Sequence, residues 1–442
     1  MCVYGRLLSS RPFAFSFLPV IVRGAVRVPG DKSISHRALL LAALARGNSA
    51  CTGLLTGDDV RRTAALLRAL GVPVAPLRQG AVVQVRGARF RSPPGTLDCG
   101  NSGTTARLGL GVIAGHPIRA RLTGDASLRR RPMQRVVDPL RAMGATFSIG
   151  SEHLPVTVQG GRLRGIAYES PVASAQVKSA ILLAALSCRV PVTVTEPYPS
   201  RDHTERLFVH LGLDLRVANG AVRYQPSAAA VPPFELAIPG DFSSAAFVIG
   251  AGVLAEGGEL LIEGVGVNPT RTGFLVALER MGAHVERLNL GAAGGEPVAD
   301  LLVRPAALRG TEVPAAEVPA LIDELPLLAV LASRASGETV FRDVGELRLK
   351  ESDRLELVAA NLRNVGVAAE ARGNDLFVAG TDRPPRGPVE TARDHRLVMA
   401  FAVLGTIPGA NVELSERRSV AISYPGFFRT LQVIGRGARH RD

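Results

Sequence analysis

One pattern of apolar positions recurs along the chain and closes each time on a hydrophobic residue followed by glycine. The pattern ends at six glycines: Gly71, Gly144, Gly212, Gly282, Gly366 and Gly435. Neighbouring glycines are 68 to 84 residues apart. The pattern is typical of a helix that ends at glycine, because glycine readily takes the left-handed conformation needed there. The sequence therefore predicts six repeated units of about 70 residues, each with a helix that ends at its glycine.

Short strand-like runs follow several of these glycines. The segments 81–87, 153–160 and 375–380 are rich in apolar residues and close on glycine. Runs of this kind, bounded by turn residues, predict β-strands. Each unit then contains strands as well as two helices, which indicates an α/β repeat and not a helical solenoid.

A second similarity within the sequence, called here the internal echo, has a longer period and divides the chain into halves. The segment 26–47, VRVPGDKSISHRALLLAALARG, is similar to the segment 236–257, LAIPGDFSSAAFVIGAGVLAEG, and their glycines Gly30 and Gly240 are 210 residues apart. This distance equals three units. We expect one domain of residues 30–239 and a second of residues 1–29 plus 240–442, so that the N-terminal strand joins the second domain. A cleft between two domains is a common place for a ligand, and we expect the active site there.

Polar residues stand at the start of five apolar helices in this pattern. The clusters read PGDKSISHR, CGNSGTTAR, ASAQVKS, IDELP and DHR. Free N–H groups and a partial positive charge attract anions to a helix N-terminus, so several converging helices would form an electropositive pocket. The alternative for each cluster is ordinary helix capping by Ser, Thr, Asp or Asn. GDKS lacks the spacing of a phosphate-binding P-loop, and no dinucleotide fingerprint is present.

Lysine is rare in this chain and is placed at or beside these clusters. Among 52 basic residues only Lys32, Lys178 and Lys350 are lysines. An ammonium is compact, mobile and able to donate three hydrogen bonds, whereas arginine offers a planar fork. The placement predicts that lysine binds anions at these clusters; chance placement of three residues is the alternative.

The net charge of +13 is compatible with a nucleic acid, a membrane surface or small acidic molecules as partner. The densest basic run, LRRRP at residues 128–132, has no aromatic neighbours, and the chain has five Tyr and no Trp. Base-stacking surfaces are therefore scarce, and we expect no nucleic-acid partner. The sequence contains no uninterrupted run of 18 apolar residues, so no membrane span is predicted.

Localisation and metal content follow from the cysteines and the N-terminus. The four cysteines form no CxxC pair and no Cys/His cluster, so neither a disulfide framework nor a metal site is expected. Pro12 and Pro19 interrupt the apolar N-terminal stretch, and no A-x-A cleavage site follows. We therefore expect a cytoplasmic protein that is not exported.

Nine motifs, in this order, resemble one known family. They are PGDKSISHR, CGNSGTTARL, LTGDASLRRRPM, ASAQVKSAILLAAL, SRDHTERL, PGDFSSAAF, IDELPLLAV, LKESDRL and DHRLVMAFAVL. Together they are similar to the 5-enolpyruvylshikimate-3-phosphate synthase family, the 3-phosphoshikimate 1-carboxyvinyltransferases, from about residue 20 to residue 435. The resemblance implies the enolpyruvyl transferase fold: a two-domain inside-out α/β barrel of six βαβαββ repeats, three per domain, with helix N-termini facing the cleft.

The resemblance also implies a reaction in the shikimate pathway to aromatic amino acids. The enolpyruvyl group of phosphoenolpyruvate is transferred to the 5-hydroxyl of shikimate-3-phosphate by addition and elimination, and phosphate is released. The partners would be these two small anions, with no cofactor, no metal and no membrane. A monomeric state is implied as well.

Candidate site residues follow residue by residue from the resembling motifs. Asp323 would be the base, Glu351 the proton carrier for C3, and Lys32 a cation that touches both substrates. The residues implied for phosphoenolpyruvate are Lys32, Asn101, Gly103, Arg131, Gln176, Glu351, Arg354 and Arg396. Those implied for shikimate-3-phosphate are Lys32, Ser33, Arg37, Ser174, Ala175, Gln176, Arg201, Asp323 and Lys350. Arginine suits such sites because its fork binds carboxylate or phosphate bidentately.

Competing interpretations remain at several positions. Asp323 would cap the following helix, Asp353 and Glu356 would form a capping box beside a solvated Lys350, and the role of Lys178 is open. A UDP-N-acetylglucosamine enolpyruvyl transferase is the alternative enzyme, although the SGAKNA-like opening common in that family is absent here. A nucleic-acid-binding protein is the alternative outside the enzymes.

Two positions distinguish this chain within the resembling family. Ile422 stands where one branch has a lysine, so one cation over phosphoenolpyruvate is missing or is supplied elsewhere. Some glyphosate-tolerant members carry alanine near Gly103. Because glycine leaves this space open, we expect glyphosate to inhibit the enzyme, and an absence of inhibition by millimolar glyphosate would contradict this.

Overall fold

The computed structural model describes residues 13–15, 21–150, 152–227 and 230–436. Pro12 and Pro19, on which the expectation of no export partly rests, lie outside these residues. Within the described part, none of the helices combines the length and the apolar character needed to cross a membrane. The same part of the chain contains no group of three or more His, Cys, Asp or Glu residues arranged to hold a metal ion.

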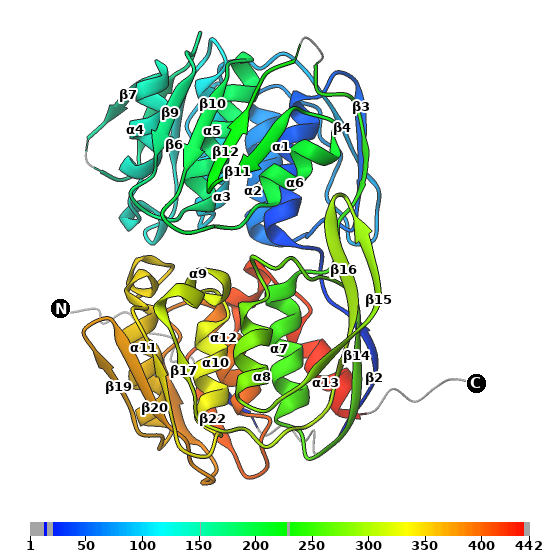
Figure 1. Ribbon diagram of the computed structural model, residues 1–442, viewed down its shortest axis with the longest axis vertical. Coiled ribbons are helices and arrows are strands. Elements are labelled where there is room, and N and C mark those ends of the chain that lie inside the picture. Colours follow the sequence, from blue (N-terminus) through cyan, green and yellow to red (C-terminus); the bar gives the residue numbers. More distant parts are fainter. Residues whose placement is uncertain (1–12, 16–20, 151, 228–229, 437–442) are drawn as a thin grey trace, which may run out of the picture.

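The described chain forms two lobes, each built around its own hydrophobic core (Figure 1). The core of the first lobe runs from Ile34 to Ile238. The core of the second lobe contains Val22 and Val28 and continues from Phe242 to Ile434. The chain therefore passes from the second lobe to the first and back again.

The two crossings lie side by side. Gly30 and Gly240 form an antiparallel bridge, Asp31 N donates to Pro239 O, and Asp241 N donates to Pro29 O, each at 2.8 Å. A Cβ atom on Gly30 would lie 1.7 Å from the carbonyl oxygen of Gly53, so no larger residue fits without a backbone shift. The two glycines that mark the internal echo are thus paired at the joint between the lobes.

In its described residues, the first lobe contains three sheets and six helices. Its first sheet has the order β13-β3-β4, its second β5-β6-β8-β7 and its third β9-β10-β12-β11. The strands are β3 Asn48–Thr52, β4 Val83–Arg86, β5 Leu97–Asp98, β6 Arg119–Thr123, β7 Thr146–Ile149, β8 Val156–Gln159, β9 Ile166–Glu169, β10 Val192–Thr195, β11 Leu215–Ala218, β12 Ala221–Tyr224 and β13 Glu235–Ala237. The helices are α1 Lys32–Leu44, α2 Asp58–Ala69, α3 Gly103–Ala114, α4 Gln134–Met143, α5 Ala175–Cys188 and α6 His203–His210, with a 3-10 turn η1 at Leu128–Arg130.

The second lobe repeats this plan. Its sheets have the orders β2-β14-β16-β15, β17-β18-β20-β19 and β21-β22-β1. The strands are β1 Phe13–Phe15, β2 Ile21–Arg27, β14 Gly257–Gly266, β15 Val285–Ala293, β16 Glu296–Val303, β17 Glu312–Val313, β18 Glu338–Phe341, β19 Ala369–Arg372, β20 Asp375–Ala379, β21 Arg386–Val389 and β22 Asn411–Leu414. The helices are α7 Phe242–Val253, α8 Gly273–Arg280, α9 Val318–Leu321, α10 Leu325–Ala332, α11 Arg354–Asn364, α12 His395–Leu404 and α13 Phe427–Arg436, with 3-10 turns η2 Ala315–Glu317, η3 Gly345–Leu349 and η4 Arg418–Ile422.

Each of the six sheets contains one parallel pair of strands and at least one antiparallel pair. In the first lobe β13, which follows the other units, pairs in parallel with β3. In the second lobe β2, which precedes the first crossing, pairs in parallel with β14. The predicted α/β fold of six repeated units is confirmed, and β2 pairs within the second lobe.

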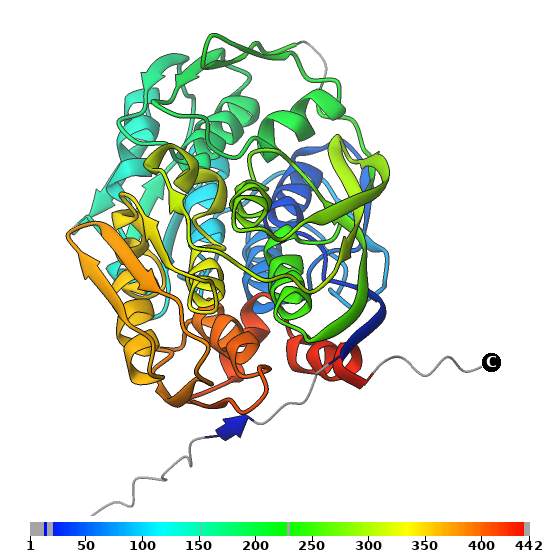
Figure 2. The ribbon, with the colours of Figure 1, turned by 60° about the horizontal axis from the view of Figure 1, so that its bottom comes forward.

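The interior of each lobe is occupied by helices. Every residue of α7, α10 and α12 is buried, and α1, α3 and α5 are buried over most of their length. The sheets lie outside these helices (Figure 2). A helix buried on all sides must be apolar all round, which explains why these segments lack a polar stripe. Most of their polar residues lie in the first two turns, at the end that faces the other lobe.

Five of the six helices that were predicted to end at a glycine do so. Gly71, Gly144, Gly212, Gly282 and Gly366 follow the ends of α2, α4, α6, α8 and α11 and all have positive φ. The prediction is wrong for Gly435, which lies inside α13. The buried Leu431 and Ile434 in the same turn pack into the core of the second lobe, so packing keeps this turn helical past the position where the motif predicts an end.

Candidate active site

A cavity of about 510 Å³ lies between the two lobes. The first lobe contributes the N-terminal turns of α1, α3 and α5, and the second lobe contributes the segment before α10, the end of η3 and the start of α12. Most of its charged lining residues are cationic. Converging helix N-termini add partial positive charge, so the cavity suits small anions.

The structure brings the candidate residues of the sequence together here. Thirteen of the fifteen line the cavity: Lys32, Ser33, Arg37, Gly103, Arg131, Ser174, Ala175, Gln176, Arg201, Asp323, Lys350, Glu351 and Arg396. The other two do not line the cavity, but each contacts a residue that does. Asn101 Oδ1 accepts a hydrogen bond from Arg131 at 3.0 Å, and Arg354 Nη2 lies 2.6 Å from Glu351 Oε2.

Asp323 lies immediately before α10 and reaches from the second lobe to the first. Its Oδ2 accepts a hydrogen bond from Arg201 at 2.5 Å and lies 3.4 Å from Arg396 Nη2. Burial alone would raise the pKa of this carboxyl, but Arg201, Arg396 and Lys350 hold it well below its usual range. The capping alternative is wrong for Asp323, because the N-cap of α10 is Glu324 and no side chain caps that helix.

Glu351 also links the lobes. Its Oε1 lies 3.4 Å from Arg131 Nη1, and its carbonyl accepts a hydrogen bond from Ser127 Oγ at 2.8 Å, both from the first lobe. Burial would raise its pKa, but Arg131 and Arg354 hold the pKa well below its usual range. Asp323 and Glu351 are therefore both anions, each set against arginines.

Arg354 is fully buried beneath Glu351. Its Nε and Nη2 donate to the carboxylate of Asp394 at 2.7 and 3.1 Å, and this carboxylate also caps α12. Its Nη1 has no hydrogen-bond partner within the described residues. Of the alternative capping box, the structure shows the half in which Asp353 caps α11 through the N–H of Glu356, whereas the Glu356 carboxylate pairs with Arg348. Lys350 lines the cavity and is not merely solvated.

On the first lobe, polar side chains hold the cavity residues in place. Arg37 donates to Thr204 Oγ1, Ser33 O and Ser179 Oγ at 2.7 to 2.9 Å. Ser174 caps α5 through the N–H of Val177. Capping and ligand binding are thus compatible at one helix start, since the cap uses only part of the first turn.

Sequence reasoning missed several residues of the cavity wall, among them Arg107 and Thr104. Arg107 donates to Gln176 Oε1 at 2.6 Å, and Gln176 donates to Thr104 Oγ1 at 2.9 Å. Burial, together with the nearby charges of Arg131 and Arg135, lowers the pKa of Arg107 to about 9. Both lie in the motif CGNSGTTAR: Thr104 directly follows Gly103, and Arg107 lies one helical turn beyond Gly103, so the helical period would have indicated Arg107.

Gly103, the first residue of α3, lies close to two cations. A Cβ atom here would lie 3.0 Å from Arg107 Nη1 and 3.3 Å from Arg131 Nη1. Both distances are short for carbon contacts, so a methyl group would displace the guanidinium groups that line the cavity. The glycine thus sets the room available between these arginines.

The structure gives Lys178 a place that the sequence left open. Its Nζ lies 2.7 Å from Glu196 Oε2 and 2.7 Å from Glu205 Oε1 in the interior of the first lobe. Burial lowers the pKa of Lys178, but the two carboxylates raise it further, so the net shift is upward. Glu196 in turn accepts hydrogen bonds from Ser174 N and Ser200 Oγ, both residues of the cavity wall. Lys178 therefore pairs with carboxylates of the protein itself and does not line the cavity.

Lys178→Met is expected to destabilise the fold by about 3 to 5 kcal/mol, because it leaves two buried carboxylates without their cation. Urea denaturation measures this loss. The control is Arg62→Met, which breaks the exposed pair with Asp98 in the same lobe and should cost less than about 1 kcal/mol. Equal destabilisation by the two variants would contradict the role given to Lys178.

Comparison with solved structures defines the class of protein. The fold matches the enolpyruvyl transferase NikO from Streptomyces tendae with a TM-score of 0.73 and 20% identity, covering 94% of this chain and 95% of that chain. It matches the EPSP synthase from Acinetobacter baumannii with a TM-score of 0.84 and 36% identity, covering 96% and 98%. The fold is thus that of the enolpyruvyl transferases, as expected.

Sequence comparison then gives the family. Residues 19–431 match the family EPSP synthase (3-phosphoshikimate 1-carboxyvinyltransferase). The chain is 48% identical to the 3-phosphoshikimate 1-carboxyvinyltransferase of Thermus thermophilus over 413 residues, 93% of this chain and 96% of the relative. It is 48% identical to that of Gloeobacter violaceus over 425 residues, 95% and 98%. The chain belongs to the EPSP synthase family and is an enzyme of this transferase class, which confirms the resemblance seen in its motifs.

Proposed function

We propose that the cleft performs the enolpyruvyl transfer with Asp323 and Glu351 in separate roles. Bound phosphoenolpyruvate shares the arginines of Glu351, so that Glu351 takes up a proton. Asp323 takes the proton of the 5-hydroxyl of shikimate-3-phosphate while that oxygen bonds to C2 of phosphoenolpyruvate and Glu351 delivers its proton to C3. The C2–O bond to phosphate then breaks, the departing phosphate takes the proton held by Asp323, and Glu351 takes a proton back from C3, which restores the double bond. The supporting observation is that two carboxylates of one lobe are set against arginines of the other across one cavity.

Arginines from both lobes form the proposed phosphoenolpyruvate site. Arg131 comes from the first lobe, and Arg354 and Arg396 come from the second. The buried Arg354 Nη1 lies 3.8 Å from Asp323 Oδ1 but makes no hydrogen bond to the described residues, which suits an anionic ligand. Asn101, Gly103, Gln176 and Lys32 complete this side. Bidentate arginine contacts bind carboxylate and phosphate strongly and in a fixed orientation.

The proposed shikimate-3-phosphate site lies mainly on the first lobe. Its residues are Lys32, Ser33, Arg37, Ser174, Ala175, Gln176 and Arg201, with Asp323 and Lys350 from the second lobe. The proposal is supported by Arg37 and Ser174, which are held at helix starts and lie in the cavity wall. Arg201 pairs with Asp323 in the protein alone and would bind the substrate in place of this carboxylate.

We also propose the division into domains of residues 30–239 and of residues 1–29 plus 240–442. The two separate cores and the paired crossings at Gly30 and Gly240 support it. A monomer in the cytoplasm, without a nucleic-acid or membrane partner, is part of the same proposal. The buried thiols of Cys51 and Cys99, whose pKa values burial raises to about 12, are compatible with a reducing compartment.

Phosphate release from phosphoenolpyruvate tests the proposed acceptor. We expect release that requires shikimate-3-phosphate. Release that instead requires UDP-N-acetylglucosamine would establish the alternative acceptor and overturn the site assignments.

A further inference from the structure

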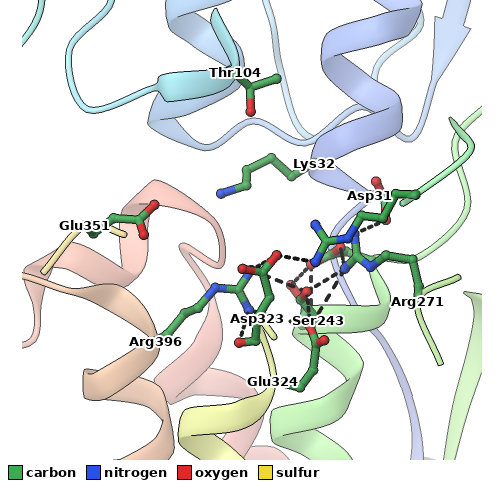
Figure 3. A network of polar contacts seen from close by, with 12 residues as sticks. Asp31, Lys32, Thr104, Ser243, Arg271, Asp323, Glu324, Glu351 and Arg396 are labelled. Atoms are coloured by element: carbon green, nitrogen blue, oxygen red, sulfur yellow. Dashed lines mark hydrogen bonds and ion pairs between the residues drawn. The ribbon is translucent and has the colours of Figure 1, made fainter. Parts of the chain in front are cut away.

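A buried polar cluster lies at the joint between the lobes (Figure 3). It consists of Asp31, Asp241, Ser243, Arg271 and Glu324, called here the joint cluster, and each member is at most 5% exposed. The motif PGDFSSAAF and the acidic residue after Asp323 belong to it, although neither has a role in the proposed chemistry. Three carboxylates in one buried place require a cation.

Arg271 supplies this cation. Its Nη1 lies 3.9 Å from Asp31 Oδ2, and its Nη2 lies 3.7 Å from Asp241 Oδ1 and 3.8 Å from Glu324 Oε1. Asp31 and Asp241 cap α1 and α7 at equivalent positions of the internal echo, directly after the two crossings. One guanidinium thus holds both crossings of the chain.

The joint cluster extends to the active site through Ser243. Ser243 Oγ accepts a hydrogen bond from Arg271 Nη2 at 2.6 Å and donates to Glu324 Oε1. The same oxygen lies 3.4 Å from Arg396 Nη2, and Glu324 Oε1 lies 3.6 Å from Arg396 Nη1. Figure 3 shows Arg396 and Arg271 on opposite sides of Ser243 and Glu324.

These contacts hold the Arg396 side chain on the side that faces away from the cavity. Its Nη1 donates to Asp323 O at 2.7 Å, and its side chain lines the cavity. Glu324 attracts Arg396 away from the cavity, but Arg271 shares the charge of Glu324, and Ser243 keeps both guanidinium groups at a fixed separation. Loss of this hydroxyl would leave Glu324 to pair more closely with Arg396.

We propose that Arg271, Ser243 and Glu324 are positioning residues that hold Arg396 in the orientation that binds phosphoenolpyruvate and link this orientation to the joint between the lobes. The proposal rests on the proposed role of Arg396. Of Arg271, Ser243, Glu324 and Arg396, only Arg396 touches the substrate. The other three act on the substrate through Arg396. A defect in Arg271, Ser243 or Glu324 should therefore weaken the binding of phosphoenolpyruvate without affecting the binding of shikimate-3-phosphate.

Two neighbouring serines provide a matched test. Ser243→Ala removes the hydroxyl between the two arginines. Ser244→Ala removes an equally buried hydroxyl that, among the described residues, bonds only to Asp241 Oδ2, at 2.8 Å, and it leaves Arg396 untouched. We expect Ser243→Ala to raise KM for phosphoenolpyruvate about tenfold, the loss of one charge-assisted hydrogen bond, and Ser244→Ala to leave it unchanged.

Two measurements complete the experiment. Calorimetric titration with shikimate-3-phosphate should give the same Kd for both variants as for the unaltered protein, and this also shows that each variant is folded. Arg396→Ala should raise KM for phosphoenolpyruvate by more than Ser243→Ala does. If Arg396→Ala has no such effect, the proposed role of Arg396 is wrong; if it does and Ser243→Ala matches Ser244→Ala, the joint cluster does not position Arg396.

Discussion

Lys32→Ala is expected to lower the rate of phosphate release by about 10²- to 10³-fold, the cost of removing one preorganised donor to developing charge. Lys32 is the first residue of α1 and extends into the space between Thr104 and the carboxylates of Glu351 and Asp323 (Figure 3). Its Nζ lies 3.1 Å from Asp59 Oδ2. It is thus placed where both anionic substrates would meet.

A charge-conserving variant separates the charge of Lys32 from its shape. Lys32→Arg keeps the cation but replaces a compact ammonium with a planar fork, and we expect an intermediate loss. Phosphate release with and without shikimate-3-phosphate measures both variants, and circular dichroism confirms that they are folded. A rate for Lys32→Ala within threefold of the unaltered protein would show that another group carries this role.

The sequence predicts the repeat because the repeat is local. Helix period, terminal glycine and the following strand all lie within one unit, and five of the six glycines have the expected left-handed conformation. Gly435 fails because glycine permits the left-handed conformation but does not require it. Packing of Leu431 and Ile434 in the core decides the conformation of that turn, and no local pattern records this packing.

The sequence predicts the wall of the active site for a related reason. Residues at the first turn of a buried helix must face an end of the lobe, so polar clusters before apolar helices mark the cavity. Contacts between distant segments carry no such mark. Arg201 and Asp323 are 122 residues apart, and Ser243 and Arg396 are 153 residues apart. Neither pair follows from any periodicity of the chain.

The three lysines show where reasoning from residue type is sound and where it is not. Lys32 and Lys350 line the cavity, as the preference for a compact cation near anions predicts. Lys178 binds anions too, but they are Glu196 and Glu205 of the protein itself. For Lys178 the rule therefore identifies the kind of partner correctly but cannot tell a substrate from a buried side chain.

Glu351→Gln is expected to lower kcat by about 10³-fold, because glutamine can neither deliver a proton to C3 nor take one back. KM for phosphoenolpyruvate should stay the same or fall, since the variant removes a negative charge that repels this anion. Steady-state kinetics separates the two effects. A comparable rise in KM would instead indicate that Glu351 mainly holds Arg131 and Arg354 in place.

Proton uptake gives a second, independent test of Glu351. Arg131 and Arg354 hold its pKa well below the usual range, so it is ionised at neutral pH. Phosphoenolpyruvate would share these arginines, weaken their hold and raise the pKa, so binding should take up protons. Uptake should be larger at pH 6 than at pH 8, because more of the carboxyl in the complex is protonated at the lower pH. Calorimetry in buffers of different ionisation enthalpy measures this uptake, and its persistence in Glu351→Gln would assign the proton to another group.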